Sequence, residues 1–156
     1  MARDLLGTQG APPFSERFHG HHDGLTRRLE AFERVLPTSG EVAEFHAALE
    51  GYVAFHDSDI HPTFVKSGAA SQTVATAFVH ALRVMLASAR LFGRTWSAAE
   101  PQGNPGQFRK ELAWAKADLE KQRTVIEHRL RSLEGAASQR FKGAHPPAPS
   151  FLVEAE

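Results

Sequence analysis

Apolar residues recur every three or four positions through most of this chain, and no strand-like alternation of useful length interrupts them. This spacing places side chains on one face of an α-helix. Four such stretches, separated by breaks that contain proline or glycine, cover residues 14–36, 41–65, 71–93 and 107–134. We therefore predict an all-α protein, folded as an antiparallel up-down four-helix bundle over residues 14–134.

Each stretch has one stripe that we expect to face the interior of the bundle. The inward residues are predicted to be Phe18, His22, Leu25, Leu29, Phe32 and Leu36 in the first stretch; Val42, Phe45, Leu49, Tyr52, His56 and Asp59 in the second; Val74, Phe78, Leu82, Met85, Ala89 and Phe92 in the third; and Phe108, Leu112, Ala115, Leu119, Ile126, Leu130 and Leu133 in the fourth. Pro62 interrupts the second stripe, so we expect that helix to kink or end near Ile60.

The two ends of the chain do not continue this pattern. Residues 1–13 are mixed in character and end in Ala-Pro-Pro, and residues 135–156 contain glycines and a proline-rich run. We expect residues 1–13 to be a flexible lead-in and residues 135–156 to be a flexible tail.

Composition narrows the range of functions. The chain has 156 residues, enough for one domain, and its 18 lysines and arginines balance 18 acidic residues, which argues against a nucleic-acid partner. No uncharged apolar run approaches the roughly 18 residues that span a bilayer, and no apolar signal segment begins the chain. The absence of cysteine excludes disulfides, cysteine-ligated metals and thiol catalysis. We therefore expect a cytoplasmic protein without a membrane segment.

Nine histidines are the unusual feature of the composition. His22 falls on the inward stripe of the first helix and His56 on that of the second, with Asp59 one turn further along. A histidine and a carboxylate at positions i and i+3 form an arrangement that metal sites in helix bundles use, since neutral imidazole is a common metal ligand. The same side chains could instead be joined by a hydrogen bond without a metal.

The distance of each histidine from the nearest turn gives its level in the bundle. His22 lies about 16 residues before the break at 37–40 and His56 about 17 residues after it, and His56 and His80 each lie 12 residues from Gly68. Because a helix rises 1.5 Å per residue, the three histidines are predicted to share one level.

These features resemble the hemerythrin-like (HHE, cation-binding) family of four-helix bundles over most of residues 14–134. The family's first-helix histidine corresponds to His22. Its second-helix histidine and carboxylate correspond to His56 and Asp59, and the segment Ile60-His61-Pro62 follows them as a similar segment does in the family.

The third-helix histidine of that family corresponds to His80, and its fourth-helix ligands fall between Arg123 and His128. The resemblance implies a non-haem iron centre of one or two ions that binds O2 or another small diatomic ligand, or that senses or handles iron. The implied metal ligands are His22, His56, Asp59, His80 and Glu127.

A haem is the alternative cofactor, because Gln122 and Arg123 hold the inward positions of the fourth helix and neither is a usual iron ligand. A haem needs one axial histidine, an apolar slot and cations for its propionates. The segment His61-Pro62-Thr63-Phe64 also resembles the proximal region of helical haem dioxygenases of the indoleamine type. The candidate haem contacts are His22, His56 or His61 as the axial ligand, Phe18 in the slot and Arg123 at a propionate.

A third interpretation needs no cofactor. On a helical wheel of the third stretch, His80 lies beside Arg83 on the solvent side, away from His22 and His56. The chain would then be a helical interaction or regulatory module. A single short bundle of this kind often forms a homodimer, so we expect a second copy of the chain as a partner.

Overall fold

The computed structural model of the chain describes residues 13–68 and 71–143, and it describes side chains as far as residue 132. This part of the chain consists of helices joined by short turns and contains no strand, which confirms the predicted all-α class. The elements are α2 (Phe14–Arg34), α3 (Ser39–Phe55), the π-helix η1 (His56–Ile60), α4 (His61–Lys66), α5 (Gln72–Val84), α6 (Ala87–Ala98), the 3-10 turn η2 (Pro101–Gly103) and α7 (Pro105–Gly143). Residues 1–12 of the predicted lead-in lie outside the described residues. α7 continues past residue 134 to Gly143, and the rest of the predicted tail, residues 144–156, also lies outside them.

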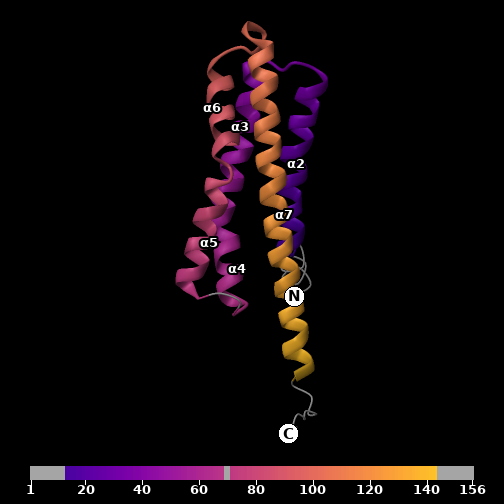
Figure 1. Cartoon of the computed structure of the whole chain (residues 1–156), viewed down its shortest axis with the longest axis vertical. Helices are drawn as coiled ribbons and strands as arrows, with labels where there is room; N and C mark the ends of the chain where they lie inside the picture. The colour runs from indigo at the N-terminus through magenta and orange to yellow at the C-terminus, as the bar shows by residue number, and fades with distance from the viewer. Residues whose placement is uncertain (1–12, 69–70, 144–156) are drawn as a thin grey trace, which may run out of the picture.

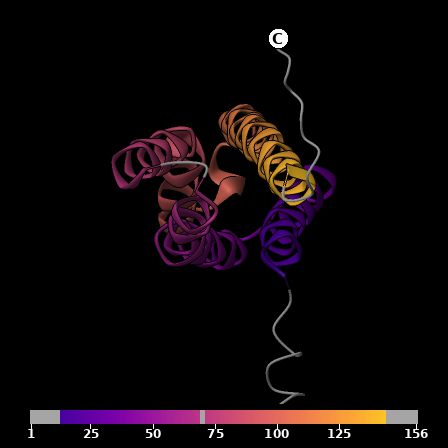
Figure 2. The same ribbon diagram turned by 90° about the horizontal axis from the view of Figure 1, so that it is seen from below.

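The helices lie along one long axis (Figure 1). α2, α3, α6 and the first part of α7 lie side by side in one half of the molecule, and α7 continues into the other half. α3 contacts α2 and α6, and α7 contacts α2 and α6. In the other half α4 and α5 contact each other. Seen along the axis, α2 and α7 are neighbours, and α5 lies across from them beside α3 and α4 (Figure 2).

Local capping explains where two of the helices begin. The Thr38 hydroxyl accepts a hydrogen bond from the Glu41 N–H, while the Glu41 carboxylate accepts one from the Thr38 N–H, which forms a capping box at the start of α3. The Ser71 hydroxyl accepts from the Val74 N–H at the start of α5. Each cap satisfies N–H groups that the first turn leaves without a carbonyl partner.

The predicted stripes of the first, second and fourth helices form most of the core, with an exception near Pro62. Leu36 and Leu130 are only partly buried, and the Leu133 side chain lies outside the described residues. Buried residues of these stripes include Phe18, Leu25, Leu29, Val42, Phe45, Leu49, Tyr52, Phe108, Leu112, Ala115, Leu119 and Ile126. Phenylalanine rings from different helices meet there, and the Phe45 and Phe92 centroids are 5.9 Å apart in an edge-on contact.

The exception follows from the π-helix, which lies where the proline was expected to disturb the second helix. Pro62 has no N–H, so it cannot donate to the Ser58 carbonyl as a helical residue would. One residue earlier, the His61 N–H donates to the His56 carbonyl five residues back, which is the hydrogen bond of a π-helix. The wider turn keeps His56 and Ile60 fully buried, but it rotates Asp59 outward. The prediction that Asp59 faces inward is therefore wrong.

The third stretch is two helices rather than one. α5 and α6 meet at a bend of 44°, where the Asp118 carboxylate of α7 accepts a hydrogen bond from the Ser88 N–H that the bend releases. The predicted inward stripe is also rotated in α5, since Val74 is 51% exposed and Phe78 and Met85 are half-buried. The residues that face the core are Ala75, Val79, Leu82, Leu86, Ala89 and Phe92.

Within the described residues, no single helix is both long enough and apolar enough to cross a bilayer. The bent pair α5 and α6 reaches the required length and composition only when the two helices are taken together.

α6 lies close against α3 at Gly93. A Cβ atom placed on Gly93 would lie 2.6 Å from His46 Nδ1 and 3.0 Å from His46 Cβ, so any side chain there would push the two helices apart. Gly51, on the exposed side of α3, has nothing within 4 Å of the equivalent position.

We predict that Gly93→Ala lowers the free energy of unfolding by about 1–3 kcal/mol, because overpacking outweighs the better helix propensity of alanine. Gly51→Ala is the matched control and should raise the free energy of unfolding by about 0.5–1 kcal/mol. Urea unfolding of both variants measures the difference. Equal changes of the same sign would contradict the close approach of α3 and α6.

Candidate functional site

Four polar side chains meet in the otherwise apolar interior of the bundle. His22 comes from α2, Tyr52 from α3, His56 from the first position of η1, and Gln122 from α7. All four are fully buried. We call these four residues the buried centre.

The Gln122 amide lies between the two imidazoles and bonds to both. On one side, its Oε1 lies 3.1 Å from His22 Nε2 and 2.6 Å from the Tyr52 hydroxyl. On the other side, its Nε2 lies 2.9 Å from His56 Nε2 and 2.9 Å from the Leu82 carbonyl oxygen. The buried centre thus links α2, α3, η1, α5 and α7 through one amide.

The hydrogen bonds determine which nitrogen of each imidazole carries the proton. The amide N–H groups of Gln122 donate to His56 and Leu82, so His56 Nε2 accepts, and His56 Nδ1–H donates to the Tyr52 carbonyl at 2.8 Å. The Tyr52 hydroxyl donates to Gln122 Oε1, so it can only accept from His22 Nε2–H at 2.8 Å. His22 Nδ1 is then a lone pair, and it is buried without a hydrogen-bond partner.

Burial keeps these groups uncharged. The pKa of His22 falls to about 4 because burial disfavours the imidazolium, and the hydrogen bond that His22 donates to Gln122 offsets only part of this effect. Burial likewise lowers the pKa of His56 to about 4. Burial also raises the pKa of Tyr52 well above its ordinary value. At neutral pH the buried centre therefore consists of two neutral imidazoles, a phenol and an amide.

The buried centre itself contains no carboxylate, and apolar side chains flank it along the bundle. Ile60, one turn after His56, and Ile126, one turn after Gln122, are fully buried. In the described part of the chain, no group of three or more histidine, aspartate or glutamate side chains is arranged to hold a metal ion. The side chains present therefore do not fit the two-iron centre that the hemerythrin-like resemblance implies.

Of the five metal ligands expected from the sequence, only His22 and His56 come together. Asp59 forms an ion pair with Arg17 of α2 at the surface, because the π-helix rotates it away from His56. His80 is exposed on α5, where its helical position places it on the outer side. Glu127 pairs with Arg123 and His19 outside the buried centre.

The three haem candidates that lie outside the buried centre are engaged by other neighbours. The Phe18 ring packs against the His22 ring with centroids 5.0 Å apart. His61 Nε2 lies 3.1 Å from the Thr76 hydroxyl of α5, and Arg123 pairs with Asp23 of α2.

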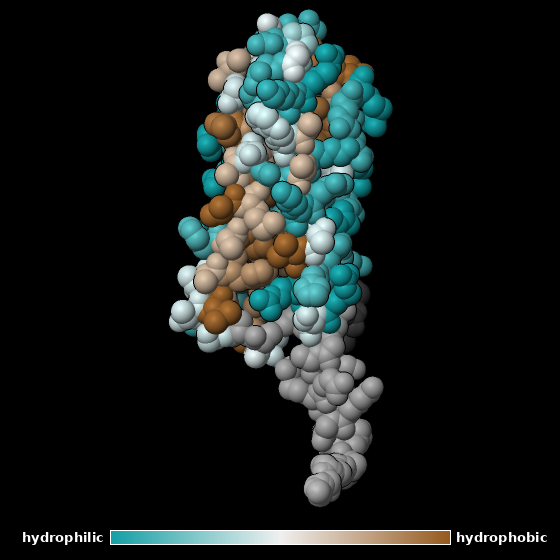
Figure 3. Space-filling view, viewed as in Figure 1, coloured by the Kyte–Doolittle hydropathy of each residue, from teal (hydrophilic) through white to brown (hydrophobic). Residues whose placement is uncertain are grey.

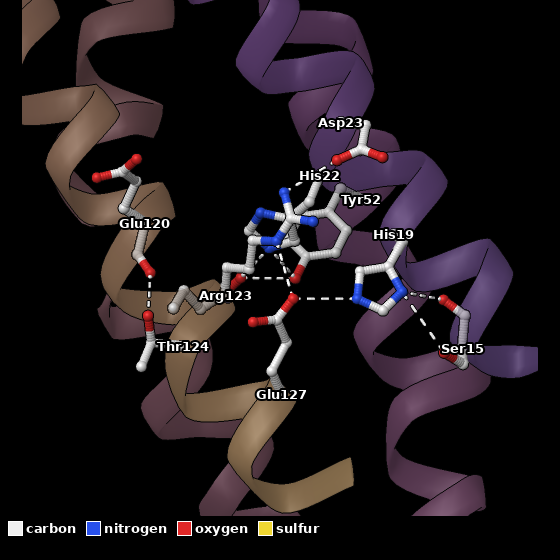
Figure 4. Close-up of polar contacts among 10 residues, drawn as sticks. Ser15, His19, His22, Asp23, Tyr52, Glu120, Arg123, Thr124 and Glu127 are labelled. Carbon is white, nitrogen blue, oxygen red and sulfur yellow. Dashed lines mark hydrogen bonds and ion pairs between the residues drawn. The ribbon is translucent and has the colours of Figure 1, made fainter. Parts of the chain in front are cut away.

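A chain of charged side chains covers the buried centre where α2 meets α7 (Figure 4). Arg123 reaches from α7 between Asp23 and Glu127, and the Glu127 Oε2 atom lies 3.1 Å from His19 Nε2. Burial raises the pKa of Glu127, but hydrogen bonds from Arg123 and His19 outweigh that effect and hold it below its ordinary value.

The neighbouring Ser15 and His19 do not form a nucleophile–base pair. His19 Nδ1 lies 2.8 Å from the Ser15 carbonyl oxygen, to which it donates, and 3.5 Å from the Ser15 hydroxyl. A nitrogen that carries a donated proton has no lone pair with which to accept one from the hydroxyl.

The pH dependence of stability tests the buried centre. In the unfolded chain both imidazoles titrate near the ordinary value of 6.5, whereas in the folded chain they titrate near 4. As the pH falls through this window the unfolded chain takes up protons that the folded chain does not, so the free energy of unfolding should fall by roughly 3 kcal/mol for each imidazole.

Urea unfolding from neutral pH down to about 4 measures this loss. His22→Gln should flatten the pH dependence, and His128→Gln, on the exposed side of α7, should leave it unchanged. A constant free energy of unfolding across the window would contradict the burial of two neutral imidazoles.

No family model, characterised protein or solved structure matches this chain. Its function is therefore inferred from the polar atoms that the helices bring together and from the surfaces that they leave open.

Proposed function

We propose that the chain is an antiparallel bundle of four helical rods that works as an interaction module, and that its buried centre is structural. The observation that carries this proposal is the Gln122 amide between His22 and His56. Because that amide already bonds to both imidazoles, neither Nε2 atom is open to a reacting group. The functional surface is then the outside of the bundle.

The contacts between helices support the four-rod arrangement. α2 contacts α3, α3 contacts α6, α6 contacts α7 and α7 contacts α2, which closes a ring. α3, η1 and α4 form one rod, and α5 and α6 form another despite their bend. Short connections between successive rods favour an antiparallel order.

Five of the six large apolar side chains that are exposed in the described part of the chain lie on α5, α6 and α7. Val84 is 59% exposed on α5, and Leu91, Trp114 and Val125 are also exposed on the neighbouring helices. Apolar residues line the α5 and α6 side of the molecule (Figure 3). We call this surface the α5–α7 face.

The α5–α7 face carries two shallow, open hollows. One hollow of about 560 Å³ is lined by Met85, Ala117 and Val125 among other residues. A second hollow of about 550 Å³ continues past Val125 to Phe78, over whose ring the Arg129 guanidinium lies at 5.2 Å. A groove with apolar walls of this kind suits the apolar stripe of a helix.

The charges around the α5–α7 face favour an acidic partner. Residues 60–99, which include all of α5 and α6, contain no aspartate or glutamate. Lys121, Arg129 and Arg131 add positive charge along the edge formed by α7, where Glu120 is the one acidic residue among those that line the two hollows. A partner helix with an apolar stripe flanked by carboxylates would match both the hollows and the charge.

Trp114 gives a direct test, because it is exposed near the groove whereas the other tryptophan, Trp96, is buried. Two synthetic amphipathic helices with the same leucine stripe, one flanked by glutamates and one by lysines, are titrated into the protein while Trp114 fluorescence is recorded. We expect saturable binding of the acidic peptide, at least tenfold tighter than binding of the basic one.

Val125→Glu should weaken binding of the acidic peptide at least tenfold, because it adds a negative charge to the groove. Val35→Glu, at another exposed apolar position, is the matched control and should bind as the wild type does. Equal binding of the two peptides would contradict an acidic helix as the partner. If the protein forms dimers that Val125→Glu dissociates, the partner is a second copy of the chain and not an acidic helix.

A single metal ion between His22 and His56 is the second candidate, favoured by one observation. Both imidazoles are neutral, and their Nε2 atoms approach the same amide from opposite sides. If Gln122 swung aside, these two nitrogens and the Tyr52 oxygen would be the donors of the iron site that the hemerythrin-like resemblance implies, with O2 as its ligand.

Elemental analysis of protein produced with iron supplied separates the two candidates. If the chain is an interaction module, we expect the purified protein to contain less than about one iron per ten chains. We also expect the iron content of His56→Ala to equal that of the wild type. Stoichiometric iron that is lost in His56→Ala would overturn the module and support the hemerythrin-like candidate.

A further inference from the structure

A polar cavity lies on the opposite flank of α5 from the α5–α7 face. It measures about 290 Å³ and lies between the π-helix, α4 and α5. Its lining consists of Asp57, His61, Thr76, Val79, His80 and Arg83. None of these side chains belongs to the buried centre or to the hollows of the α5–α7 face.

The spacing of these residues explains why they meet. Thr76, His80 and Arg83 follow one another at intervals of four and three residues, which places them on one face of α5. Asp57 and His61 face them from the π-helix and the start of α4. The extra width of the π-helix positions Asp57 beside α5, where it pairs with Arg83.

The guanidinium of Arg83 is only partly used. Arg83 Nη2 pairs with the Asp57 carboxylate, but Arg83 Nε is buried and has no hydrogen-bond partner. The Asp57 side chain is 68% exposed, so this ion pair is screened by water and contributes little. A guanidinium binds most strongly when Nε and one Nη donate together to two oxygens of one anion.

The other polar groups fix the shape of the cavity and its sign of charge. The Thr76 hydroxyl donates to the Gln72 carbonyl and accepts from His61 Nε2, so this pair forms a fixed wall. His80 is exposed at the side of Arg83. Asp57 is the one acidic side chain of the lining, and residues 60–99 supply no other.

We propose that this cavity binds a small oxyanion, a carboxylate or phosphate group, through Arg83 and His80, with the exposed Asp57 carboxylate acting as the competitor that the anion displaces. The bound oxygens would supply the acceptor that Arg83 Nε lacks. This site goes beyond the proposed interaction function and does not depend on it, because it uses neither the buried centre nor the α5–α7 face.

The Nε–H resonance of Arg83 reports on the site directly. Nitrogen-15-labelled protein is titrated with sodium phosphate in one series and with sodium acetate in a second. Sodium chloride keeps the ionic strength constant in both series. The Arg83 Nε–H resonance is assigned as the one that is lost from the spectrum of Arg83→Gln. We expect a saturable downfield shift of the Arg83 Nε–H proton, because the group gains an acceptor. Saturation by phosphate alone assigns a phosphate group, and saturation by acetate assigns a carboxylate.

Two variants make the test independent of how well Arg83→Gln folds. Asp57→Asn, at an exposed position, should tighten anion binding at least threefold, because it removes the competing carboxylate. Arg94→Gln, on the exposed side of α6, is the control and should bind as the wild type does. A linear shift that sodium chloride reproduces, or weaker binding by Asp57→Asn, would overturn the proposal.

Discussion

The arrangement of the helices depends on one amide that joins two buried imidazoles. Placing Gln122, His22 and His56 in an apolar interior would cost several kcal/mol if their polar atoms had no partners. Because the amide donates to one ring and accepts from the other, it fixes the position of α7 along the bundle axis relative to both α2 and α3. Buried networks of this kind select one packing among several that hydrophobic burial alone would allow.

The sequence was sufficient to predict what depends on helical spacing. Most residues of the stripes of α2, α3 and α7 are buried as expected, and His22 and His56 meet because equal distance from a turn means equal height. Gln122 was also expected to face inward. Its role as the bridge was not anticipated, although an amide flanked by two inward histidines is the signal that could have revealed it, since it offers both a donor and an acceptor.

The errors arise where the backbone leaves the regular helix. Pro62 was recognised as a disturbance, but spacing alone could not show that the chain would widen into a π-helix and rotate Asp59 outward. The bend between α5 and α6 contains neither proline nor glycine, and Asp118, thirty positions away in the sequence, stabilises it. Tertiary contacts of this kind are not encoded in a local pattern, so the inward face of α5 was wrongly predicted.

The central claim is that His22 and His56 are neutral and joined through Gln122, and the imidazole nitrogens themselves give the most direct test. Long-range proton–nitrogen correlation spectra at neutral pH distinguish a protonated ring nitrogen from a lone pair. The account predicts a proton on Nδ1 and a lone pair on Nε2 for His56, and the reverse for His22. A doubly protonated ring at either position, or a proton on Nδ1 of His22, would contradict it.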